Sequence, residues 1–102
     1  MAGYEKVVPT TFDSAADRIR DSIDHLHEIG EPLDAWQSDT LARALAYLQT
    51  GNYALAIDAA FRACRPQLYR TKAAEIAFSG SPTVTIAEVR ASFEEAENRP
   101  LR

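Results

Sequence analysis

The chain has 102 residues, 46% of them hydrophobic, and its 11 basic and 15 acidic residues give a net charge of −4. This length suits one domain with a modest core, so we expect residues 1–102 to form a single helical domain, with residues 1–10 a flexible leader and 99–102 a flexible tail. Because lysine and arginine are spread along an acidic chain, the sequence disfavours nucleic-acid binding.

Cysteine usage and hydropathy bear on the cellular compartment. The single cysteine, Cys64, excludes an intramolecular disulfide and a cysteine-based zinc site. The first residues lack the basic start and apolar core of a signal peptide, and no run approaches the roughly 20 apolar residues of a membrane span. We therefore expect a soluble cytoplasmic protein without a membrane partner.

The first predicted helix runs from a cap at Thr11 or Asp13 to Gly30. Its apolar residues recur at three- and four-residue steps and share one face: Phe12, Ala15, Ala16, Ile19, Ile23 and Leu26. Gly30 is expected to end the helix because glycine tolerates the left-handed backbone that commonly closes one.

The second and third predicted helices are joined by a short turn at Gly51. The second runs from about Leu33 to Thr50, and its inner stripe consists of Leu33, Trp36, Thr40, Leu41, Ala44, Leu45 and Leu48. Asn52 is expected to cap the third, whose core-facing residues are Tyr53, Ala56, Ile57, Ala60, Phe61 and Cys64. Pro66 either ends this helix or sharply kinks a longer one, and a break or sharp kink is preferred.

Beyond Pro66 the helical pattern is less regular. The apolar face there would consist of Leu68, Tyr69, Ala73, Ile76 and Ala77, followed by a loop at residues 79–82. Thr85 and Glu88 form a capping-box pattern that opens a final helix, which Pro100 stops and whose inner residues are Ile86, Val89, Phe93 and Ala96. Since no two-residue alternation is long enough for a sheet, we predict an all-α fold, a small antiparallel bundle of four or five helices.

The segment from Thr40 to Pro66 resembles a single tetratricopeptide-like helical hairpin. The likeness is carried by its turn, its small residues and its tyrosines: Ala44, Tyr47, Gly51, Tyr53, Ala56 and Ala63. Four positions depart from the family's pattern: Thr40, Arg43, Ala60 and Pro66. The resemblance implies a non-catalytic scaffold that binds peptides or protein segments, with flanking helices or a second subunit covering the ends of the hairpin.

Two histidines, His25 and His27, are the residues best suited to chemistry near neutral pH. Their spacing puts them roughly 200° apart around a helix, whereas a two-histidine metal site needs a step of three or four residues. Asp21 and Glu28 share a face with His25, an arrangement more typical of locally paired surface residues. A signalling or catalytic bundle that uses His25 or His27, phosphotransfer-like or metal-binding, is the alternative function.

The rest of the sequence favours binding over catalysis. Cys64 lies on an apolar stripe near a helix C-terminus, where the helix dipole opposes a thiolate. No phosphate loop, helical His-Glu-x-x-His pair or nucleophile elbow occurs, so we expect a non-catalytic protein with no cofactor and no metal.

Aromatic side chains provide the candidates for partner contact. Tyr53 and Phe61 are expected in the core, whereas Trp36 and Tyr47 are the candidates for a surface contact. The predicted function is a small interaction or accessory module that contacts a protein partner or a second copy of itself. A third hypothesis, a helical domain that holds a small apolar ligand, requires a cavity.

Overall fold

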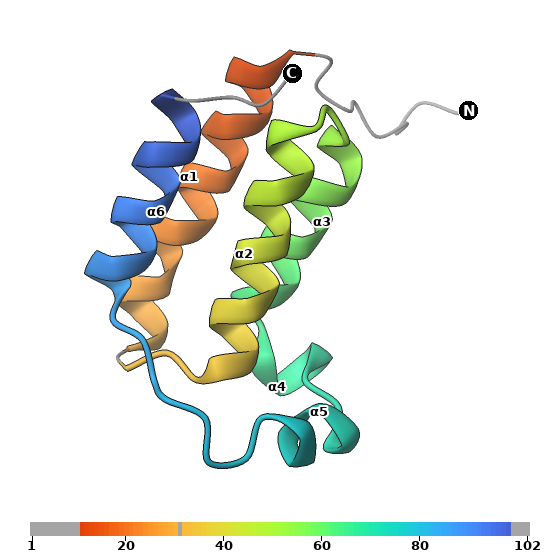
Figure 1. Ribbon diagram of the computed structural model, residues 1–102, viewed down its shortest axis with the longest axis vertical. Helices are drawn as coiled ribbons and strands as arrows, with labels where there is room; N and C mark the ends of the chain where they lie inside the picture. Colours follow the sequence, from red (N-terminus) through yellow and green to blue (C-terminus); the bar gives the residue numbers. More distant parts are fainter. Residues whose placement is uncertain (1–10, 31, 99–102) are drawn as a thin grey trace.

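The computed structural model describes residues 11–30 and 32–98, in which six helices are found (Figure 1). They are α1 (Phe12–Ile29), α2 (Ala35–Gln49), α3 (Tyr53–Ala63), α4 (Pro66–Tyr69), α5 (Lys72–Ala77) and α6 (Ile86–Asn98). The described part of the chain contains no strand, only an isolated antiparallel bridge between Leu33 and Val84. The predicted all-α class is confirmed, whereas the predicted leader, tail and stop at Pro100 lie outside the described residues.

The four longer helices alternate in direction (Figure 1). The chain passes down α1, up α2, down α3 and finally up α6, which returns beside α1. The short helices α4 and α5 lie at one end of this arrangement, where α3 ends and α2 begins. Within the described ranges, none of the helices combines the length and the hydropathy that crossing a membrane requires.

The ends of α1 follow the sequence pattern. Thr11 is the N-cap, and its Oγ1 accepts a hydrogen bond from the Ser14 N–H at 3.1 Å, so Thr11 rather than Asp13 caps the helix. At the other end the Gly30 N–H donates to the Leu26 carbonyl at 3.0 Å. Five of the six residues predicted for the inner face are buried: Ala15, Ala16, Ile19, Ile23 and Leu26.

A tight turn joins α2 to α3. The Asn52 N–H donates to the Tyr47 carbonyl at 2.9 Å, and the Gly51 N–H donates to the Leu48 carbonyl at 3.3 Å, which together form a Schellman motif. Gly51 has a φ of +85°, a conformation that disfavours side chains. Asn52 is the N-cap residue of α3, as predicted, but its side chain makes no capping hydrogen bond; the Asn52 Nδ2 donates to the Thr50 Oγ1 at 2.9 Å.

Small residues allow α2 and α3 to pack closely. This helix pair has the most extensive packing in the described chain, and its fully buried alanines are Ala44, Ala56, Ala60 and Ala63. Larger side chains fill the space between these helices, α1 and α6: Ile19, Ile23, Leu26, Leu33, Leu41, Leu48, Ile86 and Phe93. The core therefore combines close helix crossing on one side with bulky aliphatic packing on the other.

Phe61 was expected in the core and is 41% exposed. α3 buries Ala56, Ala60 and Ala63, which share one face at steps of four and three residues. Phe61 lies about 100° around the helix from Ala60, so it points away from that face. The prediction for Tyr53 was closer, since it is half-buried and packs against the core.

The start of α2 also differs from the prediction. Leu33, expected as the first helical residue, is buried in the segment before the helix, where its N–H and carbonyl pair with Val84 at 2.8 and 3.0 Å. The helix begins after Asp34, its N-cap. Three residues of the predicted inner stripe are only half-buried: Trp36, Thr40 and Leu45.

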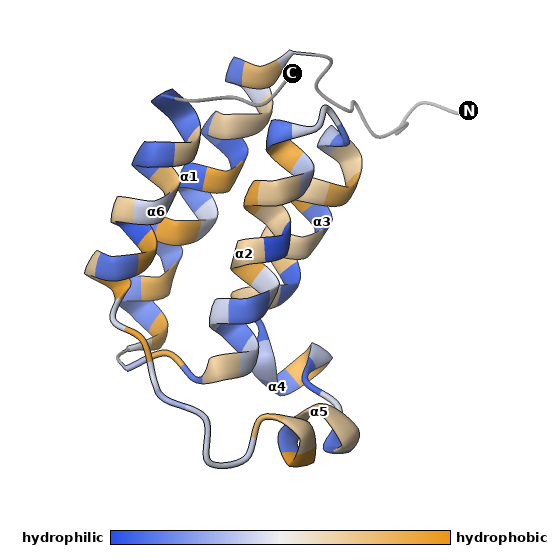
Figure 2. Cartoon of the chain, in the orientation of Figure 1, coloured by the Kyte–Doolittle hydropathy of each residue, from blue (hydrophilic) through white to orange (hydrophobic). Residues whose placement is uncertain are grey.

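The segment after Pro66 has no continuous apolar face. The predicted break is confirmed, because α3 ends at Ala63 and Pro66 starts α4. α5 buries no residue. It lies at one end of the long helices, and much of it has hydrophobic colouring (Figure 2). At the final helix the capping box is as predicted, with the Glu88 N–H donating to the Thr85 Oγ1 at 3.1 Å and the Thr85 N–H donating to the Glu88 carboxylate at 3.2 Å.

The close contact of α2 and α3 is tested by enlarging one of its alanines. We expect Ala60→Leu to lower the free energy of unfolding by about 1–3 kcal/mol, because the fully buried position leaves no space for the added atoms. Ala54→Leu, at an exposed position of α3, is the control and should stay within about 0.5 kcal/mol of the wild type. Equal urea midpoints for the two variants would contradict close packing at Ala60.

Candidate functional site

Gln37 is the one buried polar residue in the described chain, with 4% of its surface exposed. Its Nε2 donates to the Ala63 carbonyl at 3.1 Å, and its Oε1 accepts the Asp34 N–H at 3.1 Å. The Asp34 Oδ1 in turn accepts the Gln37 N–H at 2.8 Å, which completes a capping box. The same side chain thus caps the start of α2 and satisfies a carbonyl in the last turn of α3.

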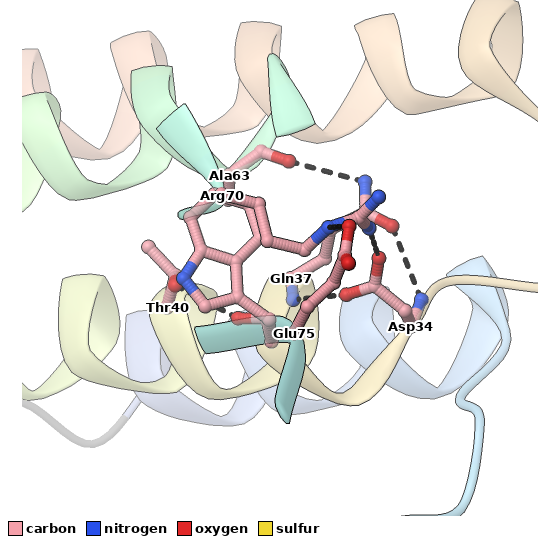
Figure 3. A network of polar contacts seen from close by, with 7 residues as sticks. Asp34, Gln37, Thr40, Ala63, Arg70 and Glu75 are labelled. Carbon is pink, nitrogen blue, oxygen red and sulfur yellow. Dashed lines mark hydrogen bonds and ion pairs between the residues drawn. The ribbon is translucent and has the colours of Figure 1, made fainter. Parts of the chain in front are cut away.

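Arg70 connects the chain between α4 and α5 to this cap (Figure 3). Its Nη1 pairs with the Asp34 Oδ2, and its Nε lies 3.9 Å from the Glu75 Oε2. We call Asp34, Gln37, the Ala63 carbonyl and Arg70 the polar anchor. Because these groups lie on different elements, the anchor fixes the position of α4 and α5 relative to α2 and α3.

Trp36 lies beside the anchor, at a small open hollow. The hollow has a volume of about 110 Å³ and is lined by Asp34, Ala35, Trp36, Arg70, Ala74, Glu75, Phe78, Ser81 and Thr83. A second hollow of about 190 Å³ lies between α2 and α6. Both are smaller than the roughly 300–1,000 Å³ typical of ligand pockets, so neither gives the apolar-ligand hypothesis a cavity of the usual size.

The two aromatics predicted to contact a partner share one face of α2 but lie well apart. Trp36 and Tyr47 are separated by three turns, about 16 Å along the helix axis. Both are half-buried, and Tyr47 packs against the core. Their role in partner contact stays a prediction; Trp36 is the one next to α5, through the hollow that it lines with Ala74 and Phe78.

Two aromatic rings and two arginines are in contact where α3 ends and α4 begins, and each ring contacts one arginine. The Arg65 Cζ lies 3.6 Å from the Phe61 ring centroid, and the Arg62 Cζ lies 5.0 Å from the Tyr69 ring centroid. The two rings meet edge to face, with centroids 6.2 Å apart. We call Phe61, Arg62, Arg65 and Tyr69 the arginine–aromatic cluster.

The cluster lies in the most basic part of the chain. Residues 59–74 contain Arg62, Arg65, Arg70 and Lys72 but no aspartate or glutamate. Basic residues are therefore concentrated in this segment, contrary to the prediction that they are spread along the chain. The signal that identifies it is the absence of acids over sixteen residues of an otherwise acidic chain.

The two histidines have different neighbours. The His25 Nδ1 lies 3.4 Å from the Glu28 Oε1, the local pairing that the sequence indicated. The His27 Nε2 lies 3.2 Å from the Arg90 Nη2, which also pairs with the Asp24 Oδ1 at 2.9 Å. In residues 11–30 and 32–98, no group of three or more histidine, cysteine, aspartate or glutamate side chains is placed to hold a metal ion.

Cys64 is buried between α3 and α1. Its Sγ donates to the Ser22 carbonyl at 3.0 Å. Burial raises the pKa of the Cys64 thiol to about 11, although the Arg65 charge opposes this shift. A thiol with this pKa is protonated at neutral pH, which agrees with a packing role.

Comparisons with protein-family models, curated proteins and solved structures found no match for the chain. Function has therefore to be inferred from the chain's own residues.

The buried amide of Gln37 is tested by truncation. We expect Gln37→Ala to lower the free energy of unfolding by about 1–3 kcal/mol, because the Ala63 carbonyl loses its side-chain donor and α2 loses half of its capping box. Gln67→Ala, at an exposed position of α4, is the matched control and should change stability by less than about 0.5 kcal/mol. Urea unfolding measures the free energy of unfolding of both variants. An unchanged free energy of unfolding for Gln37→Ala would contradict a structural role of the polar anchor.

Burial of Cys64 also predicts a pH dependence. Below the ordinary thiol pKa of 9.0 both the folded and the unfolded chain keep the proton, and the contribution of this group to stability is complete. As pH rises from 9.0 to about 11, the unfolded chain loses its proton first, so stability should fall, by roughly 2–3 kcal/mol in total. Urea unfolding of Cys64→Ala across this pH range should lack that loss, and parallel curves for the two proteins would contradict the raised pKa.

Proposed function

We propose that this protein is a small cytoplasmic protein-interaction module, a non-catalytic antiparallel helical bundle with one tetratricopeptide-like hairpin. We assign the binding surface to residues 61–76, which include α4 and all but the last residue of α5. The partner is another protein or a second copy of the chain.

The position of the exposed hydrophobic side chains supports this proposal. The described chain has five large ones, and three of them lie in residues 61–76: Phe61, Leu68 and Ile76. Leu68 is 75% exposed and Ile76 is 70% exposed. Isolated exposed hydrophobic residues are ordinary, but a concentration in one short segment is typical of an interaction surface.

Polar contacts of Arg70 hold residues 70–76 in place, and no side chain of α5 is buried in the core. Buried hydrophobic residues of α1, α2, α3 and α6 form one core, whereas α5 buries none. Contacts of Arg70 with Asp34 and Glu75 attach the segment to α2 and link it to α5. Such an arrangement presents apolar side chains at a fixed place, which favours recognition over a purely structural role.

The proposal is tested with the double variant Leu68→Ser, Ile76→Ser. Both side chains are exposed, so the unfolding free energy should change by less than about 0.5 kcal/mol. Lys72 has an 84% exposed side chain and lies between them, so an amine-reactive crosslinker used in the native cells should join it to one defined protein or to a second copy. The double variant should lose these crosslinks.

Leu55→Ser is the matched control for this experiment, because Leu55 is also exposed, at 52%, but lies near the other end of α3. It should keep the Lys72 crosslinks. Light scattering distinguishes a second copy from a different partner. A monodisperse monomer that yields no Lys72 crosslink, or crosslinks that survive in the double variant, would overturn the proposal.

A further inference from the structure

We propose that the arginine–aromatic cluster and the adjacent Leu68 bind an acidic segment of the partner protein, in which carboxylates flank a large apolar side chain. This rests on the proposed interaction function and names the chemistry of the partner.

Charge complementarity gives the first support. Residues 59–74 carry four basic side chains and no acidic one, whereas α1 and α6 together carry nine acidic residues and three arginines. Basic and acidic residues are therefore concentrated in different parts of the protein, although its net charge is −4. Arg62, Arg70 and Lys72 each pair with a carboxylate outside this region, so an acidic segment is attracted chiefly by Arg65 and by the Nη groups of Arg62. The acidic residues of α1 and α6 repel such a segment, which restricts where it binds.

The two cluster arginines have donors for carboxylates. Arg65 donates from Nη1 to the Phe61 carbonyl at 3.0 Å and forms no ion pair with any described residue. Arg62 is engaged through Nε by the Asp58 carboxylate at 2.8 Å, which leaves its Nη groups outside that pair. A guanidinium has five N–H donors in a planar fork that matches a carboxylate. Each arginine can therefore donate hydrogen bonds to one carboxylate of a partner.

Contacts with the aromatic rings restrict the conformations of both arginines. Stacking of Arg65 on Phe61 and of Arg62 on Tyr69 limits the freedom of two long side chains before a partner arrives. Binding then loses less side-chain entropy than it would with unrestrained arginines. The stacked arrangement is therefore better suited to recognition than the same charges on free side chains.

Leu68 supplies the apolar part of the surface. Its N–H donates to the Arg65 carbonyl at 3.0 Å, so its backbone adjoins the cluster, and its side chain is among the most exposed hydrophobic ones. Phe61 contributes a second partly exposed apolar surface. A purely anionic ligand such as a nucleic-acid backbone would leave these side chains uncovered, whereas an acidic segment with a leucine or phenylalanine covers them.

The test begins with a selection of random displayed peptides on the immobilised full chain. Selected peptides should carry acidic residues on both sides of a leucine or phenylalanine, and their affinity, measured by fluorescence anisotropy of labelled copies, should fall as salt is raised. Arg65→Gln and Arg62→Gln should each weaken binding about tenfold, the loss of one charge-assisted contact. Leu68→Ser should weaken it by a similar factor.

Arg43→Gln is the matched control. Arg43 is also an exposed helical arginine whose Nε pairs with an aspartate four residues before it, Asp39, at 3.1 Å. Its removal should change affinity by less than about twofold, because it lies outside the cluster. The charge change is the same as in Arg62→Gln, so a general electrostatic effect would lower binding equally in both.

The outcomes separate this proposal from the broader one. Selected peptides without acidic residues, equal binding by Arg65→Gln, or tighter binding of labelled oligothymidine than of any acidic peptide would overturn the acidic-segment proposal. If Lys72 crosslinks to a partner persist in those cases, the interaction function stands. If no peptide is selected and no Lys72 crosslink forms, both proposals fail.

Discussion

The structure depends on one buried hydrogen bond, from the Gln37 amide to the Ala63 carbonyl. An amide in a core is costly unless its polar atoms are paired, and here the pairing partners lie at the start of α2 and the end of α3. Because Asp34 belongs both to this cap and to the ion pair with Arg70, the placement of α4 follows from the same contact. A single polar residue thus couples the most closely packed helix pair to the segment that carries the proposed binding surface.

Much of the fold could be predicted from local patterns. The inner face of α1 and that of α6 were correct, since there a regular apolar stripe, a capping residue and the burial of aliphatic side chains all agree. The turn at Gly51 and the break before Pro66 also follow from backbone chemistry that is visible in the sequence. The pattern failed where polar and small residues decide the outcome. Gln37 was not predicted, although Asp34 and Gln37 have the spacing of a capping box. Phe61 was predicted in the core because a large aromatic side chain on an apolar stripe is usually expected to be buried.

The candidate surface could be predicted only in part. The sequence singled out Trp36 and Tyr47, whereas three of the five large exposed hydrophobic side chains in the described chain lie in residues 61–76. The contacts of Tyr69 with Arg62 and with Phe61 are made across the break between α3 and α4, and hydrophobic spacing along the sequence does not predict them. Charge content was the usable signal, and it becomes apparent only when acids are counted along with bases over a short window.

The shortness of α5 has a consequence for motion. A helix of six residues without a buried side chain is marginal by itself, and its backbone amides should exchange with solvent far faster than those of α1 or α6. Opening of this segment breaks the Arg70 contacts but leaves the core of the long helices intact, so the segment can reorganise without global unfolding. A partner that requires α5 in its ordered form binds with an apparent affinity reduced by the fraction of molecules in which the segment is open. The strength of the Asp34 to Arg70 ion pair therefore sets not only where α5 lies but also how much of the protein is competent to bind at a given salt concentration.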